Sequence, residues 1–133
     1  MIIVTGGAGF IGSNLIWGLN RIGYEDILVV DNLSQAEKHR NLNSLKIADF
    51  LDKENFLTLL PKLDNVQTIF HQGACSSTTE TDGRYMMENN YQFSKTLLHH
   101  SLENKIDLLY ASSASVYGDG VAGFREERAC EWP

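Results

Sequence analysis

Short apolar runs alternate with amphipathic stretches along this chain, and the alternation predicts an α/β fold. Five runs rich in β-branched and aliphatic residues have the length and composition of buried strands. They cover residues 1–5, 27–31, 45–50, 66–70 and 106–111. Apolar residues recur at helical spacing in the stretches 10–21, 52–60 and 83–104, and the polar stretch 32–44 is predicted to be a loop with a short helix. Such alternation is typical of a parallel sheet covered by helices on both faces.

Composition narrows the classes of protein to which the chain could belong. Its 133 residues have the length of one domain, without an internal repeat or an obvious linker. A formal net charge of -6 argues against a nucleic-acid partner, and no apolar run is long enough to span a membrane. The first residues lack the basic region of a signal peptide. Cys75 and Cys130 match neither a zinc motif nor a disulfide framework, so we expect a reduced, cytoplasmic protein without a metal site.

The stretch VTGGAGFIGSN, where the first predicted strand passes into the first predicted helix, contains four glycines. Gly6 would allow a sharp turn, Gly9 would let the backbone approach a pyrophosphate, and Gly12 would let the helix pack close to the strand. A helix N-terminus after such a turn favours a bound phosphate. The spacing is G-x-x-G-x-x-G instead of G-x-G-x-x-G, with similar physical roles. The stretch therefore predicts a dinucleotide-binding turn, and a plain turn is the alternative.

Asp31 ends the second predicted strand, 19 residues after Gly12. A carboxylate at this point of a dinucleotide fold hydrogen-bonds the ribose hydroxyls of the cofactor, and a turn cap is the alternative role. Lys38 and Arg40 follow in the loop, where a cation could meet the 2′-phosphate of NADP. The residues alone therefore leave the choice between NAD and NADP open.

Small residues follow the fourth predicted strand and leave room for a cofactor at its carboxyl end, where ligands bind in such sheets. They are Gly73, Ala74, Cys75 and Ser76. The sequence places no basic group beside Cys75 to activate it as a nucleophile, so we expect it to be a small buried packing residue. His71 is expected to be a hydrogen-bonded histidine at the strand end and not a catalytic base.

Hydroxyl groups follow the fifth predicted strand, in the stretch YASSASVYG. Ser112, Ser113 and Ser115 lie where the hydroxyl or carbonyl group of a substrate would meet a nicotinamide ring. A serine-rich turn without chemistry is the alternative. The position of these serines after the fifth strand of a dinucleotide fold favours the functional interpretation.

Taken together, these motifs resemble the extended short-chain dehydrogenase/reductase family, in its NAD-dependent epimerase/dehydratase group. The stretches that carry the resemblance are TGGAGFIG, VVDN, GACSSTTE and YASSASVYG. Within the family, the longer stretches IADFLDKENF and IFHQGACSSTTETDGRYMMENNYQFSKTLLHH are most similar to the epimerases that act on an ADP-heptose. The resemblance implies a Rossmann-type doubly wound parallel sheet, of which this chain would carry about five strands. Residues 1–133 would be the N-terminal part of an NAD(P)-binding domain, without the substrate domain.

The resemblance also implies an activity and a set of site residues. The activity is inversion at C-6″ of ADP-D-glycero-D-manno-heptose for the lipopolysaccharide core, through transient oxidation by bound NADP, with NAD as the alternative cofactor. The full-length enzyme would be a homo-oligomer. Besides Gly6, Gly9 and Gly12, the implied cofactor contacts are Phe10, Ile11, Asp31, Asn32, Lys38, Lys53, Gln72, Gly73, Ala74, Cys75, Ser76 and Asn89. Ser113 matches the catalytic serine.

One part of the family pattern is missing. The catalytic Tyr-x-x-x-Lys pair of the family follows the ASSA segment by a few tens of residues. The only match to that spacing here is Tyr91 with Lys95, on the predicted helix before the fifth strand, and we interpret it as a chance match. We therefore expect a chain cut before the true pair, with negligible epimerase activity. The alternatives are a non-catalytic nucleotide-binding module or gene remnant, and a related enzyme acting on another nucleotide sugar.

Overall fold

A single parallel sheet organises the chain. The structure is a computed structural model that describes residues 1–33, 35–77 and 79–131. Five strands lie in the order β3-β2-β1-β4-β5, and every neighbouring pair is parallel. Their bounds are β1 (Ile2–Thr5), β2 (Ile27–Asp31), β3 (Asp49–Asp52), β4 (Thr68–His71) and β5 (Asp107–Tyr110). The prediction of five parallel strands in an α/β fold is confirmed.

The strand order reverses at β1. From β1 the chain adds β2 and β3 on one side, then crosses back to add β4 and β5 on the other. Ile2 pairs with Ile27 on one side and with Thr68 on the other, so β1 is central. All four residues of β1 and all five of β2 are buried, which explains why these strands are continuous apolar runs. In a doubly wound sheet, such a reversal opens a crevice at the carboxyl ends of the strands.

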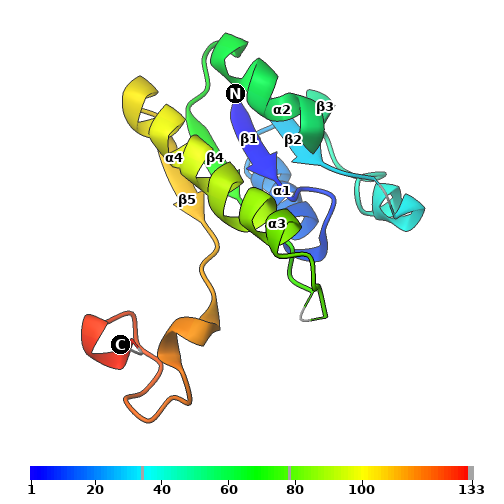
Figure 1. Ribbon diagram of the computed structural model, residues 1–133. Helices are drawn as coiled ribbons and strands as arrows, with labels where there is room; N and C mark the ends of the chain where they lie inside the picture. Colours follow the sequence, from blue (N-terminus) through cyan, green and yellow to red (C-terminus); the bar gives the residue numbers. More distant parts are fainter. Residues whose placement is uncertain (34, 78, 132–133) are drawn as a thin grey trace.

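Helices cover both faces of the sheet (Figure 1). Helix α1 (Phe10–Arg21) covers one face, where Ile16 packs in a buried cluster with Val4 and Val29. Helices α2 (Lys53–Leu59) and α4 (Phe93–Asn104) cover the other face. Their residues Phe56 and Leu97 lie in a second buried cluster with apolar residues of β1, β2 and β4. The two cores lie on opposite sides of the same strands, as expected of a doubly wound sheet.

The predicted helix over 83–104 is one continuous helical segment with a widened centre. It begins as α3 (Gly83–Met86), passes through the π-helical turn η3 (Met87–Gln92), and continues as α4. The Asp82 carboxylate caps its start by accepting hydrogen bonds from the backbone N–H groups of Arg84 and Tyr85. Lys105 ends it in the left-handed conformation, with φ of 56°. The amphipathic pattern predicted the helix but not the π-helical turn, which matters for the site below.

The strand predicted over 45–50 is wrong by about four residues, because β3 begins at Asp49. The Asn20 side chain on α1 accepts from the Lys46 backbone N–H at 2.8 Å and donates to the Lys46 carbonyl at 2.9 Å. These two hydrogen bonds hold Lys46, just before β3, against α1 and away from the hydrogen-bonded pairing with β2. Pairing with β2 starts only where the Ala48 N–H donates to the Ile27 carbonyl at 2.9 Å. The strands predicted over 66–70 and 106–111 begin one to two residues later, at Thr68 and Asp107.

Beyond β5 the chain leaves the sheet (Figure 1). This segment contains the 3₁₀ turns η4 (Ala114–Tyr117) and η5 (Arg128–Cys130). It folds on itself, with the rings of Tyr117 and Phe124 5.7 Å apart and the Cys130 thiol donating to the Ala122 carbonyl at 3.1 Å. Among the described residues, β5 pairs only with β4 and forms the edge of the sheet. Within the same described residues, no helix has the length and apolar character needed to cross a membrane.

Candidate functional site

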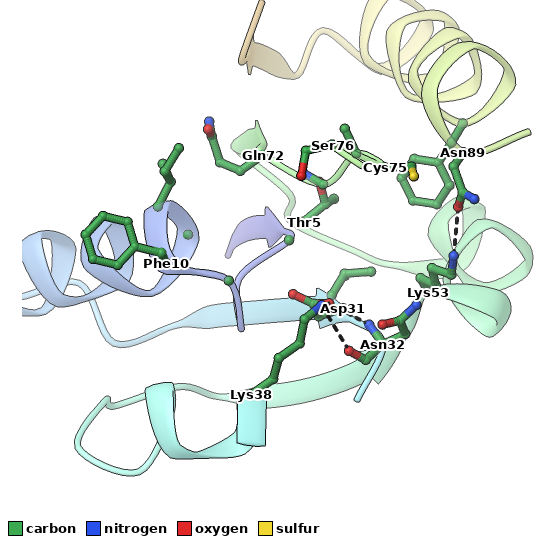
Figure 2. Close-up of a pocket in the computed structure, with 18 of the residues that line it drawn as sticks. Thr5, Phe10, Asp31, Asn32, Lys38, Lys53, Gln72, Cys75, Ser76 and Asn89 are labelled. Carbon is green, nitrogen blue, oxygen red and sulfur yellow. Dashed lines mark hydrogen bonds and ion pairs between the residues drawn. The ribbon is translucent and has the colours of Figure 1, made fainter. Parts of the chain in front are cut away.

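A cleft of about 630 Å³ opens at the carboxyl ends of β1, β2 and β4, where the strand order reverses (Figure 2). All fifteen residues predicted to contact a cofactor line it. They are Gly6, Gly9, Phe10, Ile11, Gly12, Asp31, Asn32, Lys38, Lys53, Gln72, Gly73, Ala74, Cys75, Ser76 and Asn89. Ser113 is absent from the lining. The sheet therefore brings the predicted binding residues together and leaves the predicted catalytic serine outside.

The glycine-rich turn forms one wall of the cleft. Gly6 has φ of 68°, and a Cβ atom there would lie 2.7 Å from the Gly73 backbone nitrogen. A Cβ atom on Gly12 would lie 2.2 Å from the Gly6 carbonyl oxygen. The sharp turn at Gly6 and the close packing at Gly12 are thus present as predicted. Gly9 precedes the first residue of α1, so the unpaired N–H groups of that helix begin at the cleft.

Asp31 connects this wall to the end of β2. Its Oδ2 atom accepts from the Ala8 backbone N–H at 2.9 Å, and its Oδ1 atom accepts from the Asn32 N–H at 2.7 Å. The Lys38 ammonium group lies 2.9 Å from the same Oδ1 atom. Asp31 is only 7% exposed, whereas Lys38 is 30% exposed. The carboxylate therefore fixes the glycine-rich turn and holds a lysine at the rim of the cleft.

The segment after β4 forms the opposite wall, and Asn90 holds it. The Cys75 backbone N–H donates to Asn90 Oδ1 at 2.7 Å, and Asn90 Nδ2 donates to the Cys75 carbonyl at 3.0 Å. Cys75 itself is half-buried and lines the cleft, so the expectation of a buried packing residue is wrong. Sequence reasoning missed Asn90. Its signal was an asparagine pair inside a helix, where asparagine is disfavoured unless its side chain has a specific partner.

The π-helical turn places the neighbouring Asn89 in the same cleft (Figure 2). The Lys53 ammonium group, at the start of α2, donates to Asn89 Oδ1 at 2.7 Å. It also lies 5.3 Å from the centre of the Tyr85 ring, within the range of a cation–π contact. Two predicted residues from helices far apart in sequence therefore meet at one end of the cleft.

His71 lies buried at the end of β4, beneath the cleft. Its Nδ1 atom is 2.6 Å from Thr5 Oγ1, and its Nε2 atom is 2.8 Å from Ser94 Oγ. Burial lowers the pKa of His71 below its ordinary value, because an imidazolium there would lose its hydration. The prediction of a hydrogen-bonded strand-end histidine is confirmed.

The segment after β5, which contains the predicted catalytic Ser113, is exposed to solvent at both Ser113 and Ser115. Ser113 Oγ accepts from the Ser115 backbone N–H at 3.2 Å and lies 2.6 Å from Ser115 Oγ, and both side chains are exposed. Tyr91 and Lys95 are also exposed, with the ammonium group 5.7 Å from the ring centre, and neither lines the cleft. Their spacing therefore places them next to each other on the exposed surface of a helix, outside the cleft. Over the described ranges, no three His, Cys, Asp or Glu side chains gather as a metal site.

Comparison with known proteins identifies a family whose members resemble this chain in sequence and fold. The model of the NAD dependent epimerase/dehydratase family matches residues 2–131. ADP-L-glycero-D-manno-heptose-6-epimerase from Brachyspira hyodysenteriae is 60% identical over 137 aligned positions, which include 100% of this chain and 43% of the relative.

Solved structures with the same fold are more distant in sequence. UDP-glucuronic acid 4-epimerase from Bacillus cereus, in complex with NAD, has a TM-score of 0.74 and 28% identity over 89% of this chain and 41% of its own. UDP-N-acetylglucosamine 4-epimerase from Methanobrevibacter ruminantium M1 has a TM-score of 0.78 and 28% identity over 99% of this chain and 44% of its own. The chain thus spans less than half the length of these relatives.

Proposed function

From the premise that this chain belongs to the NAD-dependent epimerase/dehydratase family, we propose that it is the dinucleotide-binding part of an ADP-L-glycero-D-manno-heptose 6-epimerase. The observation that supports this substrate is the 60% identity, across the whole chain, to an enzyme of that name. The UDP-sugar 4-epimerases share only 28% of residues, which makes another nucleotide sugar the weaker candidate. An ADP-linked heptose is accordingly the proposed substrate, and synthesis of the lipopolysaccharide core is the proposed pathway.

The cleft supports the proposed cofactor. It combines a glycine-rich turn, the N-terminus of a 12-residue helix and a buried carboxylate at the end of the second strand, which is what a dinucleotide requires. The pyrophosphate would bind at the turn before Phe10, and the adenosine ribose near Asp31 and Asn32. When bound, the nicotinamide supplies reversible hydride acceptance, while the protein binds and orients. The relative from Bacillus cereus, solved in complex with NAD, supports this class of ligand.

The pairing of Asp31 with Lys38 supports NADP over NAD. An isolated carboxylate at this position would repel a 2′-phosphate. Here the ammonium group lies 2.9 Å from the carboxylate, offsets its charge and remains partly exposed at the rim. Arg40, 70% exposed, adds a second cation on the same 3₁₀ turn η1 (Ala36–Asn41). The cofactor is therefore proposed to be NADP, with its 2′-phosphate at Lys38.

Replacing Lys38 tests this cofactor assignment. Lys38→Ala is expected to weaken NADP binding about tenfold and NAD binding less than about threefold, because only NADP offers the phosphate partner. Isothermal titration of the 133-residue protein with each dinucleotide measures both constants. Lys46→Ala is the matched control, since Lys46 is another ion-paired surface lysine, bound to Glu25 outside the cleft. Equal losses for both dinucleotides would contradict the 2′-phosphate assignment.

Catalysis is proposed to need groups beyond those that line this cleft. Ser113 is its one proposed catalytic residue in this chain, and the acid/base pair of the family has no counterpart in the cleft lining. Such a pair contributes about 10²–10⁴-fold to rate, so the 133-residue protein should bind NADP but epimerise ADP-heptose at a negligible rate. An NMR assay of C-6″ inversion tests this, and turnover at the rate of a full-length relative would contradict it. We propose that the full-length enzyme is a cytoplasmic homo-oligomer.

A further inference from the structure

We infer that His71 is a positioning residue for the cleft: through Thr5 and Ser94 it holds in place the backbone that follows β4. The inference deepens the proposed function, because this backbone is the wall on which the dinucleotide would lie. His71 itself does not line the cleft. It therefore acts through its neighbours and not by touching a ligand.

The protons of this network can be assigned from one end. Ser94 Oγ lies 2.7 Å from the Asn90 carbonyl oxygen, an acceptor only, so the Ser94 hydroxyl donates there. Ser94 Oγ must then accept from His71 Nε2–H at 2.8 Å. The neutral ring leaves Nδ1 as an acceptor, so Thr5 Oγ1–H donates to it at 2.6 Å. The contacts thus specify one neutral tautomer of His71, with its proton on Nε2.

Both ends of the network reach the same wall of the cleft. At one end, Thr5 Oγ1 accepts from the Gly73 backbone N–H at 3.3 Å. At the other end, Ser94 fixes Asn90, whose side chain makes two hydrogen bonds to the Cys75 backbone. The hydrogen bonds therefore close a loop that starts at Gly73, passes through His71 and returns at Cys75. The three consecutive wall residues 73–75 are therefore held at both ends, at Gly73 by Thr5 and at Cys75 by Asn90.

The surroundings of His71 make the network sensitive to its charge. His71 is 5% exposed and Thr5 is 2% exposed, and the Phe93 ring stacks on the imidazole with centroids 5.6 Å apart. None of these contacts supplies a negative charge that would offset the charge of a protonated ring. Asp31, Lys38 and Lys53 are the charged side chains of the described cleft lining, and each is hydrogen-bonded to another partner. A protonated ring would turn Nδ1 into a donor, and the Thr5 hydroxyl would lose its acceptor.

The test compares two helix hydroxyls of the same chain. Ser94→Ala removes the link between His71 and Asn90 without touching the cleft lining. Thr96→Ala is the matched control, since Thr96 Oγ1 makes the same type of bond, to the Gln92 carbonyl at 2.9 Å, on the exposed side of the helix. Ser94→Thr keeps the hydroxyl and should restore the wild-type behaviour. Amide hydrogen exchange of residues 72–76 and NADP titration are measured on all four proteins.

We expect Ser94→Ala to exchange the 72–76 amides about tenfold faster and to bind NADP about five- to tenfold more weakly. Thr96→Ala and Ser94→Thr should match the wild type in both measurements. Unchanged exchange over 72–76 in Ser94→Ala, or an equal change in Thr96→Ala, would overturn the inference. If the wild type binds neither NADP nor NAD, the proposed function fails, while the exchange measurement still decides the role of His71.

A second measurement needs no variant, so it remains informative if Ser94→Ala does not fold. Exchange over 72–76 in the wild type, corrected for intrinsic rates, should rise relative to the amides of α2 as the pH falls below 6.5 and through the protonation of His71 in the folded protein, which NMR of its ring protons detects. Protonation of His71 would disrupt the opposite end of the same network, where the Thr5 hydroxyl donates to Nδ1. A ratio that stays constant through the protonation of His71 would overturn the inference.

Discussion

The carboxyl ends of β4 and β5 lie side by side in the sheet but differ in how their polar groups are held. After β4, His71 is buried, both ring nitrogens have partners, and the following backbone is clamped by Asn90. After β5, the Ser113 hydroxyl is exposed, and among the described residues its hydrogen bonds lie within its own turn. Contacts with other elements thus hold the polar groups after β4, whereas within the described residues Ser113 is held by its own turn alone. Under the proposed function, the difference separates the residues that would hold the cofactor from the serine that would act in catalysis.

The largest effect is expected from a substitution that adds a side chain to the glycine-rich wall of the cleft, which faces the segment after β4. Gly12→Ala would place a methyl group 2.2 Å from the Gly6 carbonyl oxygen, and backbone atoms cannot easily move aside. We expect a loss of about 3 kcal/mol in the free energy of unfolding, measured by urea titration, together with loss of NADP binding. Gly18→Ala in the same helix is the control, because its methyl group would meet no atom within 4 Å. That variant should gain up to about 1 kcal/mol.

A smaller effect is expected from pH, and it sharpens the contrast because only the β4 side buries a histidine. Burial lowers the pKa of His71 below 6.5, so the unfolded chain binds this proton more readily than the folded protein does. The stability that His71 contributes is therefore present above about pH 6.5 and is lost as the pH falls through the folded pKa. The slope should be at most about 1.4 kcal/mol per pH unit between pH 7.5 and 5.5.

Two variants distinguish the contribution of His71 to this pH dependence of stability from that of other titrating groups. His71→Gln should flatten it, while His99→Asn, on the exposed surface of α4, should retain it. Urea unfolding at four pH values measures each slope. The same slope in His71→Gln as in the wild type would show that the buried imidazole is not its source.

The smallest effect is expected on the β5 side. Ser113→Ala removes an exposed hydroxyl whose contacts are confined to its own turn, so the free energy of unfolding should change by less than about 0.5 kcal/mol. The NADP dissociation constant should also be unchanged, because the side chain lies outside the cleft lining. A threefold or greater loss of NADP affinity would contradict this, since it would place the Ser113 hydroxyl at the ligand.

The sequence predicted those features that depend on local chemistry. The glycine spacing and the apolar runs gave the turn, the central strands and the position of Asp31 correctly, because backbone freedom and burial are local requirements. The start of β3 was missed because a distant clamp, from Asn20 to Lys46, decides where pairing begins. Asn90 was missed because its partner Cys75 lies on another segment, before the helix begins, and because the π-helical turn alters the helix register. Contacts between distant segments leave only weak marks in a sequence.

The close approach of Gly6 to Gly73 has a consequence for synthesis of the protein. Thr5 and Gly73, which hydrogen-bond between the two walls, are separated by 68 positions. A ribosome that adds about 5–20 residues per second needs roughly 3–14 s to make that stretch. During this interval the nascent chain exposes its glycine-rich turn but has no second wall against which a cofactor could bind. A dinucleotide bound at the proposed site would therefore stabilise only chains in which β4 has already joined β1, and its binding would report that this step of folding is complete.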